Sequence, residues 1–378
     1  MPTAPDPQRW DIFCTVVDNY GDIGVCWRLA RQLAAEHGLR IRLWVDDLRA
    51  FARLCPEIDP GRAQQVCAGV DVRHWCQPFA SSVDPAEVVI EAFACQLPAD
   101  YVAAMARQRP APRWINLEYL SAETWVADCH GLPSPHPQLP LLKHFFIPGF
   151  DDRSAGLLRE RDLLARHAAF DAAAWWSRHG GSPAAGQLSV SLFAYENRAA
   201  ATLIECWRNG EPAVRCLATD SRVLPSVARA LGRALAPGDA VHERGLELHV
   251  LPFMRQEAYD DLLAACDVNF VRGEDSLVRA IWAGKPFVWQ IYPQDDDAHR
   301  VKLDAFLDRY CAGLSGAADG ALRDFWHAWN AETASARQWH AFAVHLPEIA
   351  EHTRRWRDKL AQLPDLATTL ADFCRNPI

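Results

Sequence analysis

The residues best suited to acid–base chemistry are two carboxylates, Asp18 and Asp22, in one early loop of the chain. An apolar run at 11–17 predicts a buried strand, and the loop leads from it into an amphipathic stretch at 25–36. In open parallel sheets, ligands bind outside the carboxyl ends of the strands, where glycine lets a substrate approach the backbone. We therefore expect both carboxylates to face a ligand crevice.

A helix cap is the structural alternative for this loop, because an aspartate before a helix often caps it or interacts favourably with its dipole. One aspartate could be such a cap, but two carboxylates flanking Asn19, Tyr20 and Gly21 are harder to explain in this way. A dinucleotide-binding loop fits less well. Gly21 and Gly24 lack the third glycine at its usual spacing.

A second candidate site lies at 272–276, where an expected strand at 268–271 ends and a helix begins. The free backbone N–H groups of a helix start, together with Arg272 and Ser276, suit an anionic diphosphate. Asp275 and Ser276 could equally form a simple N-cap. A cap leaves Glu274 without a role, so both readings stay open on the residues alone.

Composition limits the classes of protein. A chain of 378 residues is long enough for two domains. Its net charge of −9 argues against general binding of nucleic acid or anionic membranes. No apolar run of about 18 residues and no signal-like N-terminus is present, so we expect a cytoplasmic protein without a membrane partner. The 12 cysteines are scattered through apolar segments, which favours reduced, buried thiols.

Strand-like and helical patterns alternate twice along the chain, which predicts an α/β fold with two parallel sheets. A helical pattern at 153–177 precedes a Gly- and Pro-rich linker at 178–186. We therefore expect two Rossmann-like domains at 1–183 and 184–350, and a helical tail at 351–378 that packs back on the first domain. The expected strands lie at 11–17, 41–45, 88–91, 114–117, 188–195, 214–218, 246–251, 268–271 and 286–291.

Several separated motifs resemble one family, the protein-arginine rhamnosyltransferases of translation elongation factor P, the EarP family. The motifs lie at 18–24, 27–31, 90–95, 116–123, 157–162, 272–276 and 291–295. The resemblance covers nearly the whole chain. It implies a GT-B fold and an inverting transfer of L-rhamnose from dTDP-β-L-rhamnose to an arginine guanidino nitrogen of elongation factor P, with no cofactor, metal or nucleic acid.

The resemblance also implies roles for particular residues. Asp22 corresponds to the proposed catalytic base, and Asp18 and Glu274 correspond to carboxylates needed for activity. Tyr20 and Tyr259 stand where phenylalanine often occurs, and ring stacking survives either change. The expected acceptor-side residues are Tyr20, Gly21 and Glu118, and the expected donor contacts are Phe193, Tyr195, Phe253, Gln256, Tyr259, Arg272, Asp275 and Ser276.

Two other functions remain as alternatives. A glycosyltransferase acting on a small molecule or lipid would share the donor motif without needing the Asp18 and Asp22 pair. A non-catalytic nucleotide-binding protein would use the acidic loop only as a helix cap. The acidic run at 295–297 is expected to be a solvated helix start rather than a metal site, because adjacent carboxylates point in different directions.

Overall fold

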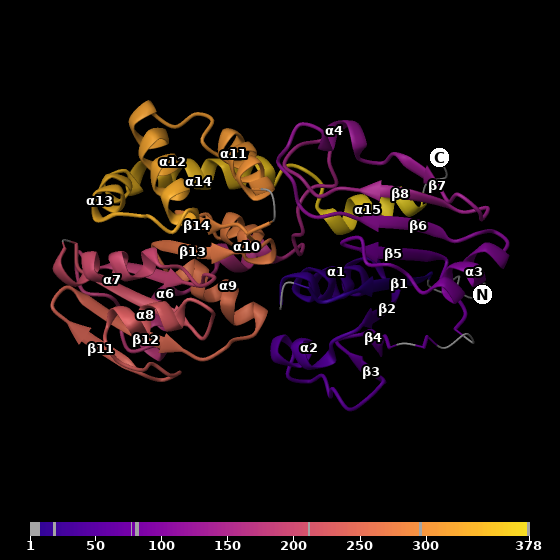
Figure 1. Cartoon of the computed structure of the whole chain (residues 1–378), viewed down its shortest axis with the longest axis horizontal. Helices are drawn as coiled ribbons and strands as arrows, with labels where there is room; N and C mark the ends of the chain where they lie inside the picture. Colours follow the sequence, from indigo (N-terminus) through magenta and orange to yellow (C-terminus); the bar gives the residue numbers. More distant parts are fainter. Residues whose placement is uncertain are drawn as a thin grey trace. The chain divides into compact units, whose positions relative to one another are not determined.

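The computed structural model describes residues 8–17, 20–76, 78–79, 83–210, 212–294 and 297–375. Contacts divide the chain into two units (Figure 1): the first comprises Met1–Arg161 and Leu360–Ile378, and the second comprises Asp162–Lys359. Asp18, Asn19, Asp295 and Asp296 lie outside the described residues. Among the described helices, none is both long and apolar enough to cross a membrane.

The first unit is built on a sheet with strand order β3-β4-β2-β1-β5-β6-β8-β7. Its inner strands are parallel, and β3 and β7 pair antiparallel at the two edges. The strands are β1 (Arg9–Cys14), β2 (Arg40–Val45), β3 (Gln64–Cys67), β4 (Val70–His74), β5 (Val88–Ala92), β6 (Arg113–Leu117), β7 (Pro133–Pro135) and β8 (Leu142–Phe146); the helices are α1 (Gly21–His37), α2 (Leu48–Leu54), α3 (Ala99–Arg107), α4 (Val126–Cys129) and α15 (Leu366–Arg375).

Alternation along the strands explains how this sheet is covered on both faces, because successive side chains point to opposite sides. In β1, Trp10, Ile12 and Cys14 belong to the core cluster that includes α1 and α15. Phe13 belongs to the cluster on the other face, with Tyr101 and Met105 of α3. Such double coverage produces the continuous apolar runs that are typical of parallel strands.

The second unit repeats this design with the strand order β11-β12-β10-β9-β13-β14, in which only β11 is antiparallel to its neighbour. Its strands are β9 (Leu188–Leu192), β10 (Val214–Thr219), β11 (Ala240–Glu243), β12 (Leu246–Leu251), β13 (Val268–Arg272) and β14 (Phe287–Gln290); its helices are α5 (Leu163–Ala168), α6 (Ala172–Arg178), α7 (Ala199–Asn209), α8 (Leu224–Ala230), α9 (Gln256–Ala265), α10 (Asp275–Ala283), α11 (Ala298–Tyr310), α12 (Gly316–Asn330), α13 (Ala336–Val344) and α14 (Leu346–Leu360).

Tryptophan supplies much of the packing in this unit. Trp207, Trp282, Trp326 and Trp329 are among the largest fully buried side chains. Phe270 of β13 packs edge-on against both Trp207 and Trp329, with ring centroids 6.2 and 4.9 Å away. The tryptophans therefore join the sheet to α7 and α12, in keeping with the large apolar area that each ring buries.

The helical pattern at 153–177 gives only two short helices, α5 and α6. The chain before them is held in another conformation by a close contact with the tail. Gly156 has a positive φ of 74°, and a Cβ there would meet the carbonyl oxygen of Pro364 at 2.3 Å. Only glycine fits such an approach, so the segment that precedes α5 cannot continue as a helix.

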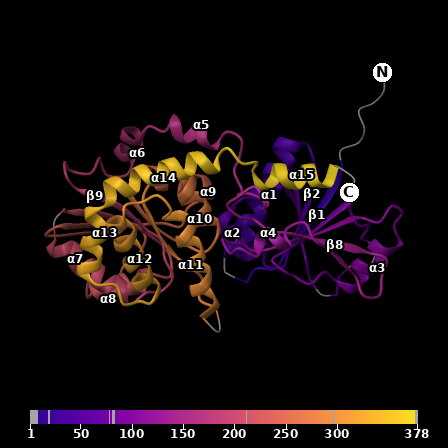
Figure 2. The same cartoon turned by 90° about the horizontal axis from the view of Figure 1, so that it is seen from above.

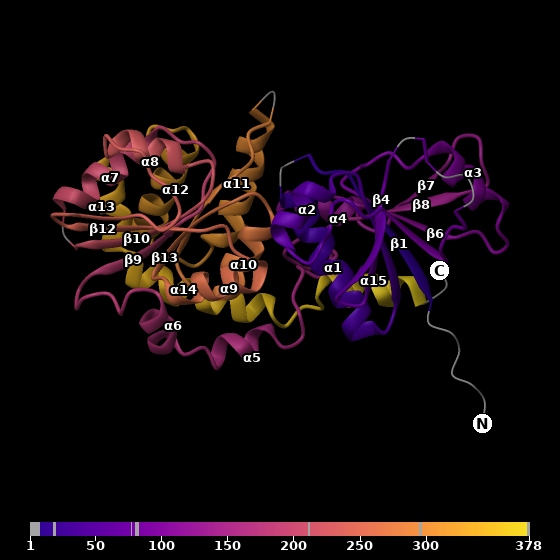
Figure 3. The ribbon, with the colours of Figure 1, turned by 90° about the horizontal axis from the view of Figure 1, so that it is seen from below.

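The boundaries between the two units lie at 161/162 and 359/360, whereas the expected domain boundaries lie at 183/184 and 350/351. Contacts place α5, α6 and the linker in the second unit, which ends at Lys359. Figures 2 and 3 show α5 and α6 on the same side of that unit as α14. Helix α15 lies in the first unit, where Leu366, Leu370 and Cys374 join the core beside α1. Two hydrogen bonds hold the linker after α6 to the second sheet, because Arg215 of β10 donates to the carbonyls of Gly180 and Gly181.

Candidate active site

Both candidate motifs lie at the carboxyl end of a strand that borders the point where the strand order reverses. In the first unit, β1 lies between β2 and β5, and Asp22 follows β1; in the second, β9 lies between β10 and β13, and Arg272 ends β13. Crevices form at such switch points because the connections leave toward opposite faces of the sheet. The sheet topology therefore places each motif where an α/β unit binds ligands.

Asp22 lies in the first turn of α1, and only 3% of its surface is exposed. Its Oδ2 accepts the backbone N–H of Val17 at 2.8 Å, and its Oδ1 lies 3.5 Å from the hydroxyl of Tyr119. A carboxylate in the first turn also interacts favourably with the positive end of the helix dipole. The hydrogen bond from Val17 orients the carboxylate at the start of α1.

The segment beside Asp22 has an unusual backbone. Phe93 and Ala94 follow β5 with φ values of 56° and 54°, a region that side chains other than glycine rarely adopt. The Phe93 ring stacks on Tyr119 with centroids 4.7 Å apart. Such strain is typical of sites where the surrounding structure fixes one arrangement. Tyr119 and Phe93 lie within two of the sequence motifs, but their residue types alone do not predict a role in the site.

The other residues expected on the acceptor side also lie at the carboxyl ends of strands in the first sheet. Tyr20 is the N-cap residue of α1, and the Arg53 guanidinium lies 5.7 Å from its ring centroid. Gly21 begins α1. Glu118 directly follows β6, and its Oε1 accepts a hydrogen bond from the side-chain amide of Asn116. The placement of Asp18 is outside the described residues.

In the second unit, Arg272 is held against two rings. Its guanidinium carbon lies 4.7 Å from the ring centroid of Phe193 and 4.5 Å from that of Tyr195. Only 7% of Arg272 is exposed. Cation–π contacts of this kind fix the plane of the guanidinium while its N–H groups remain donors. The cluster therefore holds a fixed positive charge at the carboxyl end of β13.

The start of α10 is built around the same arginine. Ser276 Oγ accepts the backbone N–H of Arg272 at 3.0 Å and donates to the Arg272 carbonyl. Gly273 turns the chain with a positive φ of 62°, and Glu274 is the N-cap residue without a side-chain cap hydrogen bond. Gln256 Nε2 donates to Asp275 Oδ2 at 3.2 Å. The simple cap by Asp275 or Ser276 is therefore not what starts this helix.

The remaining expected donor contacts are partly joined to this cluster. Tyr259 packs edge-on against Phe193, with centroids 5.4 Å apart. Burial raises the pKa of Tyr259 well above its usual value, so the hydroxyl stays protonated as a hydrogen-bond donor. Phe253 lies on the connection between β12 and α9, at the same edge of the sheet.

Three further residues support the cluster and were not assigned from the sequence. The Oε1 of Gln290 accepts the backbone N–H of Tyr195 at 2.9 Å, and the Trp289 indole N–H donates to the Gly273 carbonyl at 2.8 Å. Tyr292 packs against Tyr195 with centroids 5.5 Å apart. They belong to β14 and the residues just after it, so only the pairing of β13 with β14 brings them to the site.

A buried ion pair joins α9 and α10, the two helices that carry several of the expected donor contacts. Arg279 of α10 donates from Nε and Nη2 to the two carboxylate oxygens of Asp260 of α9, at 2.9 and 2.7 Å. Both side chains are almost fully buried. A bidentate pair of this kind restricts the relative position of α9 and α10 more than apolar packing alone.

Among the described residues, one group of side chains has the spacing of metal ligands: His242, Glu247 and His249. Glu247 is already held by the Arg215 guanidinium at 3.0 Å and by His249 Nε2 at 2.7 Å. The positive charge of Arg215 beside Glu247 disfavours the binding of a metal ion, so we interpret these side chains as a polar network. In the acidic run, Asp297 is the N-cap residue of α11 and pairs with Arg300 at 3.3 Å.

Two α/β units, each with a candidate site beside the switch point of a parallel sheet, define the GT-B fold. The solved glycotransferase of kitacinnamycin shares this fold with a TM-score of 0.50 and 13% identity, covering 98% of this chain and 99% of that chain. The fold class expected from the sequence is confirmed.

The family is shown by the sequence comparisons. The model of the elongation-factor P (EF-P) rhamnosyltransferase EarP matches residues 10–375. A protein-arginine rhamnosyltransferase of Pseudomonas putida is 51% identical over 98% of this chain and 99% of its own length. A solved structure that describes EarP-mediated arginine glycosylation of EF-P is 37% identical, with a TM-score of 0.68 over 98% of this chain and 100% of that chain. The chain belongs to the EarP family and is an enzyme, as its motifs predicted.

Proposed function

We propose that this enzyme transfers L-rhamnose from dTDP-β-L-rhamnose to a guanidino nitrogen of an arginine in translation elongation factor P, with inversion at the sugar carbon. The names of the similar proteins support the sugar and the arginine acceptor. The similar solved structure, which concerns glycosylation of EF-P, supports the acceptor protein. The donor nucleotide and the stereochemistry rest on the family resemblance of the motifs.

The observation that carries the proposal is the position of Arg272. The guanidinium lies against Phe193 and Tyr195 at the point where α10 begins. When the bond between the sugar and the phosphate breaks, the departing dTDP gains negative charge. A fixed guanidinium and the N–H groups of a helix start stabilise that charge without a metal ion. The backbone N–H of Ser276 belongs to this helix start, and the hydroxyl of Tyr259 adds a further donor.

The acceptor chemistry assigns the base to Asp22. A guanidinium has a pKa above about 12 and a delocalised lone pair, so it attacks only after a carboxylate has polarised it. In the transfer, the arginine nitrogen forms a bond to the anomeric carbon as the bond from that carbon to the phosphate oxygen breaks. The nitrogen then loses its proton to the Asp22 carboxylate. The transition state has oxocarbenium character, which a nearby carboxylate stabilises.

The other carboxylates have supporting roles in this proposal. Asp18 orients the guanidinium beside Asp22, and Glu118 extends the acidic rim of the acceptor side. Glu274 stabilises the positive charge that develops on the sugar. A planar guanidinium can be held by two carboxylates at once, whereas an ammonium is a point charge. The acceptor is therefore an arginine rather than a lysine.

Incubation of the enzyme with dTDP-rhamnose and EF-P tests the proposal. Mass spectrometry should show one deoxyhexose on EF-P and none on EF-P in which the acceptor arginine is replaced by lysine. NMR of the modified arginine should show the α-anomer, as inversion of a β-linked donor requires. Equal labelling of the lysine variant would defeat the account of the acidic pair, and a β-anomer would exclude inversion.

A further inference from the structure

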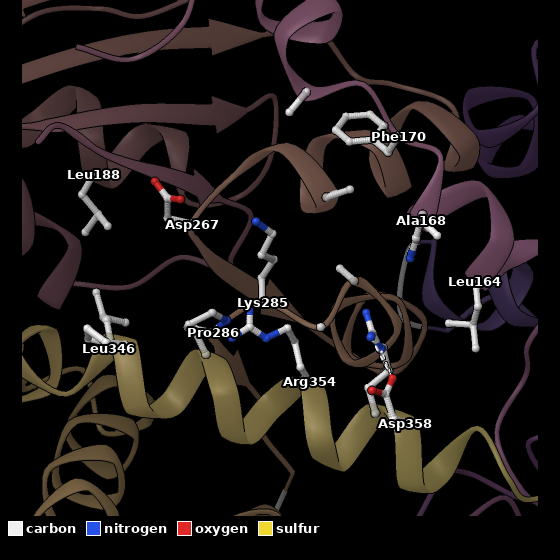
Figure 4. A pocket seen from close by; sticks show the side chains of 18 residues that line it. Leu164, Ala168, Phe170, Leu188, Asp267, Lys285, Pro286, Leu346, Arg354 and Asp358 are labelled. Atoms are coloured by element: carbon white, nitrogen blue, oxygen red, sulfur yellow. Dashed lines mark hydrogen bonds and ion pairs between the residues drawn. The ribbon is translucent and has the colours of Figure 1, made fainter. Parts of the chain in front are cut away.

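A cavity of about 610 Å³ lies within the second unit, away from the donor motif (Figure 4). Leu188 at the start of β9, Asp267 just before β13 and Pro286 just before β14 line it. These residues lie at the amino ends of the parallel strands. Arg272 lies at the carboxyl end of β13, so the cavity and the donor motif are at opposite ends of the strands.

The walls of this cavity come from two segments that are far apart in the sequence. Leu164 of α5 and Phe170 lie on one side, and Leu346 and Arg354 of α14 lie on the other. The chain passes between its two units just before α5 and at the end of α14. A ligand in the cavity would therefore contact both segments next to the points where the chain leaves the second unit.

Two of the basic groups in the cavity already serve the end of α10. His167 Nδ1 donates to the Trp282 carbonyl at 3.0 Å. Burial lowers the pKa of His167, so the ring is neutral with Nε2 as an acceptor, and this atom is buried without a hydrogen-bond partner among the described residues. Arg357 packs on Gly284, the C-cap residue of α10, and pairs with Asp358 at 2.7 Å. These contacts complement the negative end of the helix.

Lys285 and Arg354 are the other two basic residues among the cavity lining. No hydrogen bond or ion pair joins either cation to a residue that the structure describes. Figure 4 shows Arg354 reaching from α14 toward Pro286, and Lys285 extending into the cavity on the side of Asp267. Asp267 is engaged elsewhere, because its Oδ2 accepts the backbone N–H and the hydroxyl of Ser189 at 2.9 and 2.6 Å. Lys285 is half-buried and Arg354 is exposed, and together with Arg357 they exceed the two carboxylates of the lining, Asp267 and Asp358, by one positive charge.

We propose that this cavity binds a small organic phosphate. Its volume lies within the usual range for small-molecule sites. Lysine and arginine are the side chains that most often bind phosphate oxygens. Phe170, Leu188 and Leu346 supply an apolar wall for the body of the ligand, and the buried Nε2 of His167 accepts a hydrogen bond from it. A ligand bound in the cavity contacts both α5 and α14, and so restrains both connections between the units.

Calorimetry with phenyl phosphate as the probe, on the full chain saturated with dTDP, tests this site. Binding should weaken by about tenfold or more in Lys285→Gln and in Arg354→Gln, because each loses one charge-assisted contact. Arg355→Gln is the matched control. Arg355 is exposed, pairs with Glu351 at 2.7 Å and does not line the cavity. Its affinity for the probe should equal that of the unsubstituted chain.

Ala350→Phe keeps both cations but fills the cavity from α14, so it should also abolish binding. Bound probe should slow amide hydrogen exchange in α5 and α14 together. The proposal is overturned if the unsubstituted chain does not bind the probe, if all variants bind it equally, or if dTDP displaces it. Equal affinity for benzoate would exclude a phosphate as the preferred ligand, and binding of phenol would show that the charge is irrelevant.

Discussion

The carboxylate of Asp22 accepts the backbone N–H of Val17 at 2.8 Å, so the first turn of α1 is tied back to the residues that follow β1. The contact uses Oδ2, and Oδ1 lies near the Tyr119 hydroxyl. Because the backbone contact fixes the plane of the carboxylate, the direction in which Oδ1 accepts a proton is also fixed. The strand and the helix therefore position the proposed base together.

Replacement Asp22→Asn should reduce turnover on the order of a hundredfold or more, because the amide keeps the shape but cannot take the proton. The amide oxygen can still accept the Val17 N–H, so folding should be preserved. Affinity for dTDP should stay unchanged, since Asp22 belongs to the first unit and the donor motif to the second. Near-normal turnover in this variant would move the base to another residue, with Asp18 as the first candidate.

Replacement Arg272→Ala should weaken dTDP binding by roughly 1.5–3 kcal/mol, the usual size of a charge-assisted contact. Calorimetry measures this directly. Arg198→Ala is a suitable control in the same unit, because Arg198 is exposed and pairs only at the surface with Glu332, at 3.1 Å. Unchanged dTDP affinity in Arg272→Ala would refute the assignment of the diphosphate to the start of α10.

Removal of divalent metal should leave the transfer intact, because Arg272 and a helix start supply the charge that stabilises the leaving group. The test is turnover with and without EDTA, after dialysis against the chelator. Activity that disappears with EDTA and returns with Mg²⁺ or Mn²⁺ would contradict the metal-free mechanism. It would direct attention to the acidic run that ends at Asp297.

Replacement Arg279→Met should destabilise the second unit by about 3–5 kcal/mol, since it leaves the carboxylate of Asp260 buried without its partner. Both side chains are almost fully buried. The double variant Asp260→Leu with Arg279→Met should be far less destabilised, because it leaves no unpaired charge. Denaturant unfolding of the unsubstituted protein, the single variants Arg279→Met and Asp260→Leu, and the double variant measures the coupling. A loss in the double variant equal to the sum of the two single losses would show that the pair is not coupled.

His130 should make stability fall in mild acid. Burial lowers the pKa of His130 below its ordinary value of 6.5, and its Nδ1 accepts the Ile147 N–H at 3.1 Å. As the pH falls below about 6.5, the unfolded chain binds a proton that the folded chain resists, so this contribution to stability, present above that pH, is lost. In His130→Asn the amide oxygen replaces Nδ1 and cannot titrate. Between about pH 7.5 and about pH 5.5, the free energy of unfolding should therefore decrease less in the variant than in the unsubstituted protein.

Regular elements of the fold follow from local pattern where the pattern is strong. The strand at 246–251 has the bounds that the apolar spacing predicts. The strand expected at 11–17 ends at Cys14, because the N–H groups of Val16 and Val17 bond to the carboxylates of Asp46 and Asp22 instead of to a neighbouring strand. No local pattern contains those partners.

The sequence by itself determined the fold class, the family and the types of residue that act, because apolar periodicity and contiguous motifs are local properties of the chain. Only the tertiary structure decided which of those residues meet. Strand order brings Gln290 and Tyr195 together across 95 positions, and it joins Tyr119 to Asp22 across 97. The unit boundary was decided in the same way. Gly156 and Pro364 touch because the tail returns to the first unit, and a contact so distant in sequence leaves no periodic signal.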